Sequence, residues 1–154
     1  MNISVKANKL YLFLVSLLVL GLLSACSSPA PEANPPKEPL GPPDRVDVVY
    51  FYKGEECHCQ EVVGDNIEAT LFINFNGELT NGKLTFQSIN LDNEENATIA
   101  YKYNATPESL FINIVRADTE QIIAVPEILL VKDDDEALFK LVNTRIRQAL
   151  DGEA

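Results

Sequence analysis

A proline-rich segment divides the chain and limits how much of it can fold. Seven of the nine prolines lie between Ser27 and Asp44, at positions 29, 31, 35, 36, 39, 42 and 43. Proline lacks a backbone N–H and favours extended polyproline II geometry, so residues 26–44 predict a tether that would span up to about 55 Å at roughly 3.1 Å per residue. Residues 45–154 remain, and they are enough for one compact domain.

The residues before this tether predict export and lipidation. Lys6 and Lys9 precede an apolar run, Leu10–Leu23, which is shorter than the roughly 20 residues that a spanning helix needs. The run ends in Leu-Ser-Ala followed by Cys26, which resembles the bacterial lipoprotein box. The resemblance implies that residues 1–25 are a signal peptide and that the Cys26 thiol carries the lipid. An ordinary secretory peptide with a chance cysteine is the alternative.

This reading predicts the location and the partners of the domain. We expect a lipid anchor, palmitate included, on Cys26 that holds the chain at the cell membrane, facing the extracytoplasmic side, where disulfides persist. The chain has 23 acidic against 12 basic residues and a net charge of −11. Because a phosphate backbone attracts lysine and arginine, this balance argues against a nucleic-acid partner.

The first half of the domain predicts a strand, a helix and a second strand. Residues 46–52 are β-branched and aromatic without strict alternation, as in a strand covered on both faces. Apolar residues then recur every four positions from Val63 to Phe75, which predicts a helix of about four turns that Gly64 weakens by about 1 kcal/mol. Asn-Gly pairs at 76–77 and 81–82 predict turns, and residues 83–91 predict the second strand.

The second half predicts a short helix, a hairpin and a final helix. Residues 92–95 have capping-box character and begin a helix that ends near residue 103. Residues 110–115 and 121–125 predict an antiparallel hairpin with a five-residue loop. Asp133 is the predicted cap of the last helix, and its apolar face is Leu138, Leu141, Val142, Ile146, Ala149 and Leu150. Strands separated by helices predict parallel pairing, with the hairpin as an antiparallel edge.

The order β-α-β-α-β-β-α, with cysteines between the first strand and the first helix, resembles the thioredoxin fold. The domain is similar to small bacterial thioredoxin-like proteins often labelled nitrophenyl-compound nitroreductase subunits. The residues that carry this resemblance are 48–54, the cysteine pair, 82–92, Tyr103, Ser109-Leu110 and the capped last helix. The resemblance implies an α/β domain with a four-stranded mixed sheet and three main helices.

Two features depart from the pattern of this fold family. Thioredoxin-like enzymes usually carry Cys-x-x-Cys, whereas a single residue separates Cys57 from Cys59. The family also places a cis-proline before the third central strand, and Pro107 is the candidate, about one position early.

The candidate site is Cys57-His58-Cys59. With Cys26 lipidated, two thiols remain, and neighbouring thiols in an oxidising compartment either pair or hold a metal. A helix N-terminus and a protonated His58 would stabilise a thiolate, whereas the acidic neighbours Glu55, Glu56 and Glu61 would oppose it.

Three functions follow from this site. The first is a thiol–disulfide oxidoreductase without a bound cofactor that acts on thiols or disulfides of exported proteins; by analogy with the fold, Cys57 attacks and Cys59 resolves. The second is a metal- or metalloid-binding lipoprotein in which Cys57, His58 and Cys59 hold Zn or Cu. The third is a non-catalytic interaction module built on the thioredoxin fold.

Overall fold

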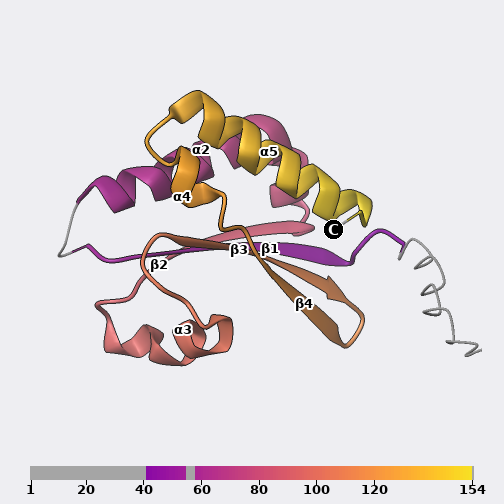
Figure 1. Ribbon diagram of the computed structural model, residues 1–154. Helices are drawn as coiled ribbons and strands as arrows, with labels where there is room; N and C mark the ends of the chain where they lie inside the picture. Colours follow the sequence, from indigo (N-terminus) through magenta and orange to yellow (C-terminus); the bar gives the residue numbers. More distant parts are fainter. Residues whose placement is uncertain (1–40, 55–57, 154) are drawn as a thin grey trace, which may run out of the picture. The chain divides into compact units, whose positions relative to one another are not determined.

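A four-stranded mixed sheet with helices on both faces is the centre of the computed structural model, which describes residues 41–54 and 58–153 (Figure 1). The predicted signal peptide, Cys26, most of the tether and Cys57 lie outside the described residues. The elements are β1 (Arg45–Tyr52), α2 (His58–Thr80), β2 (Leu84–Asn90), the 3₁₀ turn η2 (Glu94–Asn96), α3 (Ala97–Tyr103), β3 (Ser109–Arg116), β4 (Thr119–Ala124), α4 (Ile128–Val131) and α5 (Asp135–Asp151). The predicted fold class is confirmed: the order is β-α-β-α-β-β-α, with α2, α3 and α5 as the three main helices.

The strand order is β2-β1-β3-β4, with β1 at the centre of the sheet. β1 and β2 are parallel, as predicted, but β3 is antiparallel to β1, so the expectation of parallel pairing for every helix-separated strand was wrong. The reason is the length of α3: seven helical residues advance the chain by about 10 Å, whereas an eight-residue strand is about 26 Å long. α3 does not carry the chain back along the sheet, and β3 starts at Ser109, opposite Phe51, close to where β2 ended.

The core has two parts, one on each face of the sheet. α2, α4 and α5 cover one face and α3 lies on the other (Figure 1). The larger cluster joins alternate β1 residues (Val46, Val48, Tyr50) to α2 and α5, including the predicted face residues Leu138, Val142, Ile146 and Ala149. The smaller cluster joins Val49 and Phe51 to Ile89, Tyr103 and Phe111. Double coverage is confirmed for the second half of β1 only: Val49 and Phe51 pack with Tyr103 of α3, whereas Asp47 lines a polar cavity on that face.

Helix α2 is longer than predicted. It runs to Thr80 with non-helical backbone at Phe75 (φ −134°, ψ 25°), so Asn76-Gly77 lies inside a helix and the predicted turn there was wrong. Leu79 packs against the larger core cluster, which favours one more helical turn. The second Asn-Gly pair does form a turn, with Gly82 at φ +77°, a conformation that glycine adopts without strain.

Local capping and turn predictions needed several corrections. The cap of α5 is Asp134, whose carboxylate accepts from the Ala137 N–H at 3.0 Å, and not Asp133. Asn93 is the N-cap of η2 and makes no side-chain hydrogen bond there. The β3–β4 turn has two residues rather than five, because Arg116 already pairs with Thr119. The four-residue helix α4 was not predicted.

The last residues of the predicted tether contact the domain. The backbone N–H of Asp44 donates to the Val115 carbonyl at 2.9 Å, and its carboxylate accepts from the Ala117 N–H at 2.6 Å. Pro43 is buried. These contacts fix where the chain enters β1.

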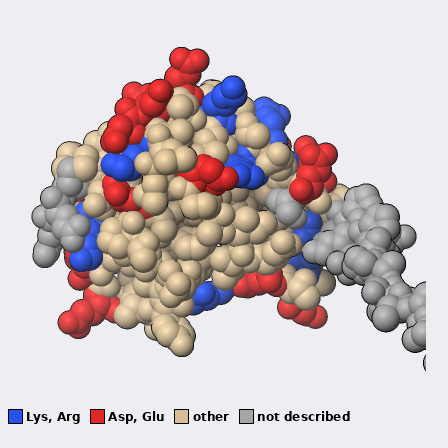
Figure 2. Space-filling view, in the orientation of Figure 1, with Lys and Arg blue, Asp and Glu red and all other residues tan. Residues whose placement is uncertain are grey.

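The charged side chains of the described residues are interspersed on the surface. On the face shown in Figure 2, acidic and basic groups alternate around an uncharged centre, without a continuous basic patch. Within residues 41–54 and 58–153, no helix has the length and apolar character needed to cross a membrane.

Candidate functional site

Two of the three predicted site residues begin helix α2. His58 is its first residue and Cys59 its second, directly after the loop that follows the central strand β1. Cys59 is solvent-exposed and disulfide-bonded, and its partner lies outside the described residues, as does Cys57. Cys59 therefore belongs to the first turn of α2, and the N-terminal end of a helix dipole stabilises a nearby thiolate.

The imidazole of His58 faces an acidic neighbour. Its Nδ1–H donates to Oε2 of Glu61, one turn along the helix, at 2.6 Å. The His58 side chain is 82% exposed and that of Glu61 39%. This contact holds a carboxylate in the first turn of α2, close in sequence to Cys59, which works against a second negative charge there.

The helix start is anchored to the end of β1. Gln60 is buried, and its side-chain oxygen accepts from the Lys53 N–H at 2.8 Å. One turn further, Gly64 is buried against the sheet: a Cβ built there would lie 2.9 Å from Oγ of Ser88 and 3.3 Å from Cδ1 of Tyr50. The absence of a side chain at Gly64 thus allows the helix to approach β1 and β2 closely, which accounts for a glycine that weakens the helix.

The loop before β3 lies at the C-terminal end of β1, since Ser109 pairs with Phe51. No described peptide bond is cis, so Pro107 has a trans bond, unlike the cis-proline of the resembled family. Glu108 has a left-handed backbone (φ +62°), and its carboxylate pairs with Lys132 at 3.1 Å. An apolar cavity of about 190 Å³ lies between this loop, the end of β4 and α4.

A buried tyrosine lies beneath this end of the domain. Tyr50 is fully buried, its ring is stacked with Tyr52 at 6.4 Å between centroids, and its hydroxyl has no hydrogen-bond partner among the described residues. Burial, followed by the negative charge of Glu108, raises the pKa of Tyr50 strongly. The phenol is therefore neutral at physiological pH.

The metal alternative depends on a residue that is not described. Within 41–54 and 58–153, no group of three or more His, Cys, Asp or Glu side chains is placed to hold a metal ion. Because Cys57 belongs to the proposed ligand set and lies outside those ranges, binding of Zn or Cu by Cys57, His58 and Cys59 stays a prediction.

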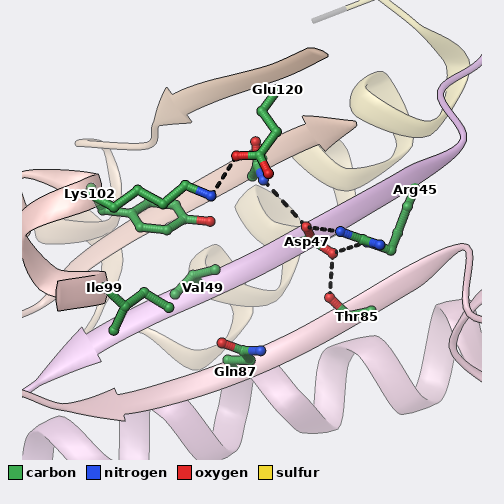
Figure 3. A pocket seen from close by; sticks show the side chains of 10 residues that line it. Arg45, Asp47, Val49, Thr85, Gln87, Ile99, Lys102 and Glu120 are labelled. Atoms are coloured by element: carbon green, nitrogen blue, oxygen red, sulfur yellow. Dashed lines mark hydrogen bonds and ion pairs between the residues drawn. The ribbon is translucent and has the colours of Figure 1, made fainter. Parts of the chain in front are cut away.

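A polar cluster that the sequence reasoning missed lies on the second face of the sheet (Figure 3). Asp47 accepts four hydrogen bonds: from Nε and Nη2 of Arg45 at 2.6 and 3.1 Å, from Oγ1 of Thr85 at 2.7 Å and from Nδ2 of Asn113 at 3.3 Å. Burial opposes its ionisation, but these donors outweigh it and lower its pKa. The signal was present in the sequence: Asp47 and Asn113 are single polar residues inside otherwise apolar strand runs.

Comparison with known proteins gives a likeness to a solved structure, but not to a family model. No family model matches this sequence, and no curated protein matches it. Among solved structures, the solution structure of a thioredoxin from Thermus thermophilus matches with a TM-score of 0.45 and 13% identity, over 68% of this chain and 76% of that chain. The fold class itself follows from the strand order and pairing directions observed in the sheet.

Proposed function

We propose that this chain is a membrane-anchored, extracytoplasmic thioredoxin-like protein that exchanges disulfides through Cys57 and Cys59. The observation that carries the proposal is Cys59, a disulfide-bonded and exposed cysteine in the first turn of the helix that follows the central strand. Exposure allows a partner to reach the bond, and the helix N-terminus stabilises the thiolate that forms when the bond breaks.

The exchange balances as a two-electron transfer between dithiol and disulfide. With the pair reduced, the Cys57 thiolate attacks a substrate disulfide, that S–S bond breaks, and one substrate sulfur leaves as a thiolate that takes up a proton. The Cys59 thiolate then attacks the Cys57 sulfur, which releases the second substrate thiol and leaves Cys57 and Cys59 joined. The reverse sequence oxidises a substrate dithiol, and a low-molecular-weight thiol or a membrane partner returns the pair to the other state.

The exchange is tested with single serine variants and an aromatic disulfide whose reduction changes its absorbance. Cys57→Ser should abolish turnover, whereas Cys59→Ser should accumulate a mixed disulfide through Cys57, seen as a mass adduct. Cys26→Ser is the matched control, because it removes a cysteine but leaves the pair intact. If neither Cys57→Ser nor Cys59→Ser changes turnover and no adduct forms, the proposal is wrong and a non-catalytic module remains.

Metal analysis separates the second function from the first. Stoichiometric Zn or Cu in the purified protein, lost in both the Cys57→Ser and Cys59→Ser variants, would replace disulfide exchange by metal binding. The redox proposal instead expects no metal loss on substitution and two thiols that appear only after reduction, by thiol counting.

The anchor is tested separately at Cys26. Cys26→Ser should move the protein out of the membrane fraction and abolish incorporation of labelled palmitate. A wild-type protein of unprocessed size that incorporates no palmitate would contradict lipidation, without affecting the exchange chemistry.

A further inference from the structure

A second cavity, of about 300 Å³, opens on the part of the sheet that α3 leaves uncovered (Figure 3). Its lining comes from all four strands and α3, on the opposite side of the sheet from α2 and the cysteine site. α3 is too short to cover the whole face, so the hydrophobic packing ends at Val49 and polar side chains follow. The volume suits a small molecule.

The cavity contains a buried acceptor without a partner. Asn113 is 1% exposed, and its amide orientation is determined because Nδ2 must donate to the carboxylate of Asp47. This leaves Oδ1 of Asn113 without a hydrogen-bond partner in the described part of the chain. A buried acceptor left unsatisfied is unfavourable, so a ligand that donates an N–H to it would gain a hydrogen bond that the empty domain lacks.

Four charged side chains surround this acceptor and sum to zero. Arg45 pairs with Asp47, and Lys102 pairs with Glu120 at 2.5 Å. The two ion pairs also interact electrostatically. Asp47 and, to a smaller extent, Glu120 raise the pKa of Arg45, and Glu120 and, to a smaller extent, Asp47 raise the pKa of Lys102. A ligand with one net charge would leave one of these groups uncompensated, whereas a ligand with one charge of each sign would not.

The remaining surface of the cavity is apolar. Val49 is buried at the floor, and Figure 3 shows Val49 and Ile99 lying between Lys102 and Gln87. The ring of Tyr103 also lines the cavity, with Nζ of Lys102 5.7 Å from its centroid. A short aliphatic side chain would bury its surface there.

We propose that this cavity binds a small zwitterion of the α-amino acid class. Its ammonium group donates to Oδ1 of Asn113 and to Glu120, and it is attracted by Asp47, whose lone pairs are already filled. Its carboxylate accepts from Lys102, and its side chain packs on the apolar floor formed by Val49 and Ile99. No cysteine takes part, so this site is independent of the proposed disulfide exchange.

The test uses the full-length chain and L-alanine, followed by NMR at the side-chain amide of Asn113. Alanine should cause a saturable shift, while acetate, ethylammonium and glycerol at the same concentrations should not. Absence of a saturable alanine shift would overturn the proposal. An equal response to glycerol would also overturn it, because it would indicate a site for hydroxyl groups rather than for paired charges.

Variants that remove one charge should gain binding of a ligand with a single charge, which is a more specific result than loss of alanine binding alone. Glu120→Gln should weaken alanine binding at least about tenfold, or about 1.4 kcal/mol, and should create acetate binding because Lys102 loses its partner. Lys102→Gln should instead create ethylammonium binding. These side chains are 42% and 47% exposed, so both variants are expected to fold.

The matched control is Glu127→Gln. Glu127 forms an ion pair with Arg145 at similar exposure, 41% and 40%, and it does not line this cavity. The Glu127→Gln variant should leave alanine binding unchanged. If Glu127→Gln weakens binding as much as Glu120→Gln, or if Glu120→Gln fails to gain acetate binding, the paired-charge site is wrong.

Discussion

Replacing two glycines of the same helix by alanine should change stability in opposite directions. Gly64 and Gly77 both lie within α2, and the same substitution at both gives the same chemical change. They differ in surroundings: nothing lies within 4 Å of a Cβ at Gly77, whereas a Cβ at Gly64 meets Ser88 at 2.9 Å and Tyr50 at 3.3 Å.

The magnitudes follow from two opposing effects. Alanine in place of glycine stabilises a helix by about 0.5–1 kcal/mol, and Gly77→Ala should retain this gain. At Gly64 the added methyl group must displace the ring of Tyr50, which is fully buried in the central strand, and such overpacking costs about 1–3 kcal/mol. Gly64→Ala should therefore be about 1–3 kcal/mol less stable than Gly77→Ala.

The assays are urea unfolding and thermal unfolding at neutral pH, both followed by far-UV circular dichroism. For a domain of about 100 residues, 1 kcal/mol corresponds to roughly 4 °C in Tm, so the two variants should melt about 4–12 °C apart. Adding Ser88→Ala to Gly64→Ala removes the closest contact and should recover part of the loss. If Gly64→Ala is as stable as Gly77→Ala, the close approach of α2 to the sheet is not what requires glycine at position 64.

Two further predictions concern the partly buried carboxylate of Asp47 and the capping carboxylate of Asp134. Asp47→Ala should destabilise the domain by about 2 kcal/mol at neutral pH, because it leaves the buried Asn113 amide and the Thr85 hydroxyl without their acceptor. The pKa of Asp47 is lowered by folding, so its contribution is complete above its ordinary pKa and is lost as pH falls through the folded value. The stability difference should accordingly shrink on acidification, and a pH-independent difference would contradict this account. Asp134→Ala should lower the free energy of unfolding by about 1 kcal/mol, because the α5 cap is lost. Asp133 has an 84% exposed side chain, so Asp133→Ala should change that free energy by less than about 0.5 kcal/mol. Equal effects of the two variants in chemical unfolding would refute the cap assignment.

The candidate site illustrates what could be predicted from local sequence. The strand at 46–52 and the four-residue periodicity from Val63 to Phe75 are local patterns, and together they put His58 and Cys59 at a strand-to-helix junction, where the structure has them. The role of Gly64 was not predictable, because periodicity reports which face of a helix is apolar and not how closely that face approaches the strand opposite.

The polar cavity could not be predicted for a different reason. Asp47 and Asn113 are 66 positions apart, and they meet because β1 and β3 pair in one register, Asp47 opposite Asn113. Each is a visible polar interruption in an apolar run, but neither strand alone indicates that the other supplies its partner.

The sequence by itself determined the order of the main elements, the apolar faces of α2 and α5 and the place of Cys59 at the start of a helix, since all of these depend on neighbours within a few residues. Only the tertiary structure decided the direction of β3, the use of Asp134 rather than Asp133 as a cap and the polar half of the second sheet face. The direction of β3 and the polar half of the second face have one physical reason. α3 is shorter than the strands it connects, so the chain turns back at one end of the sheet and the other end of that face stays uncovered.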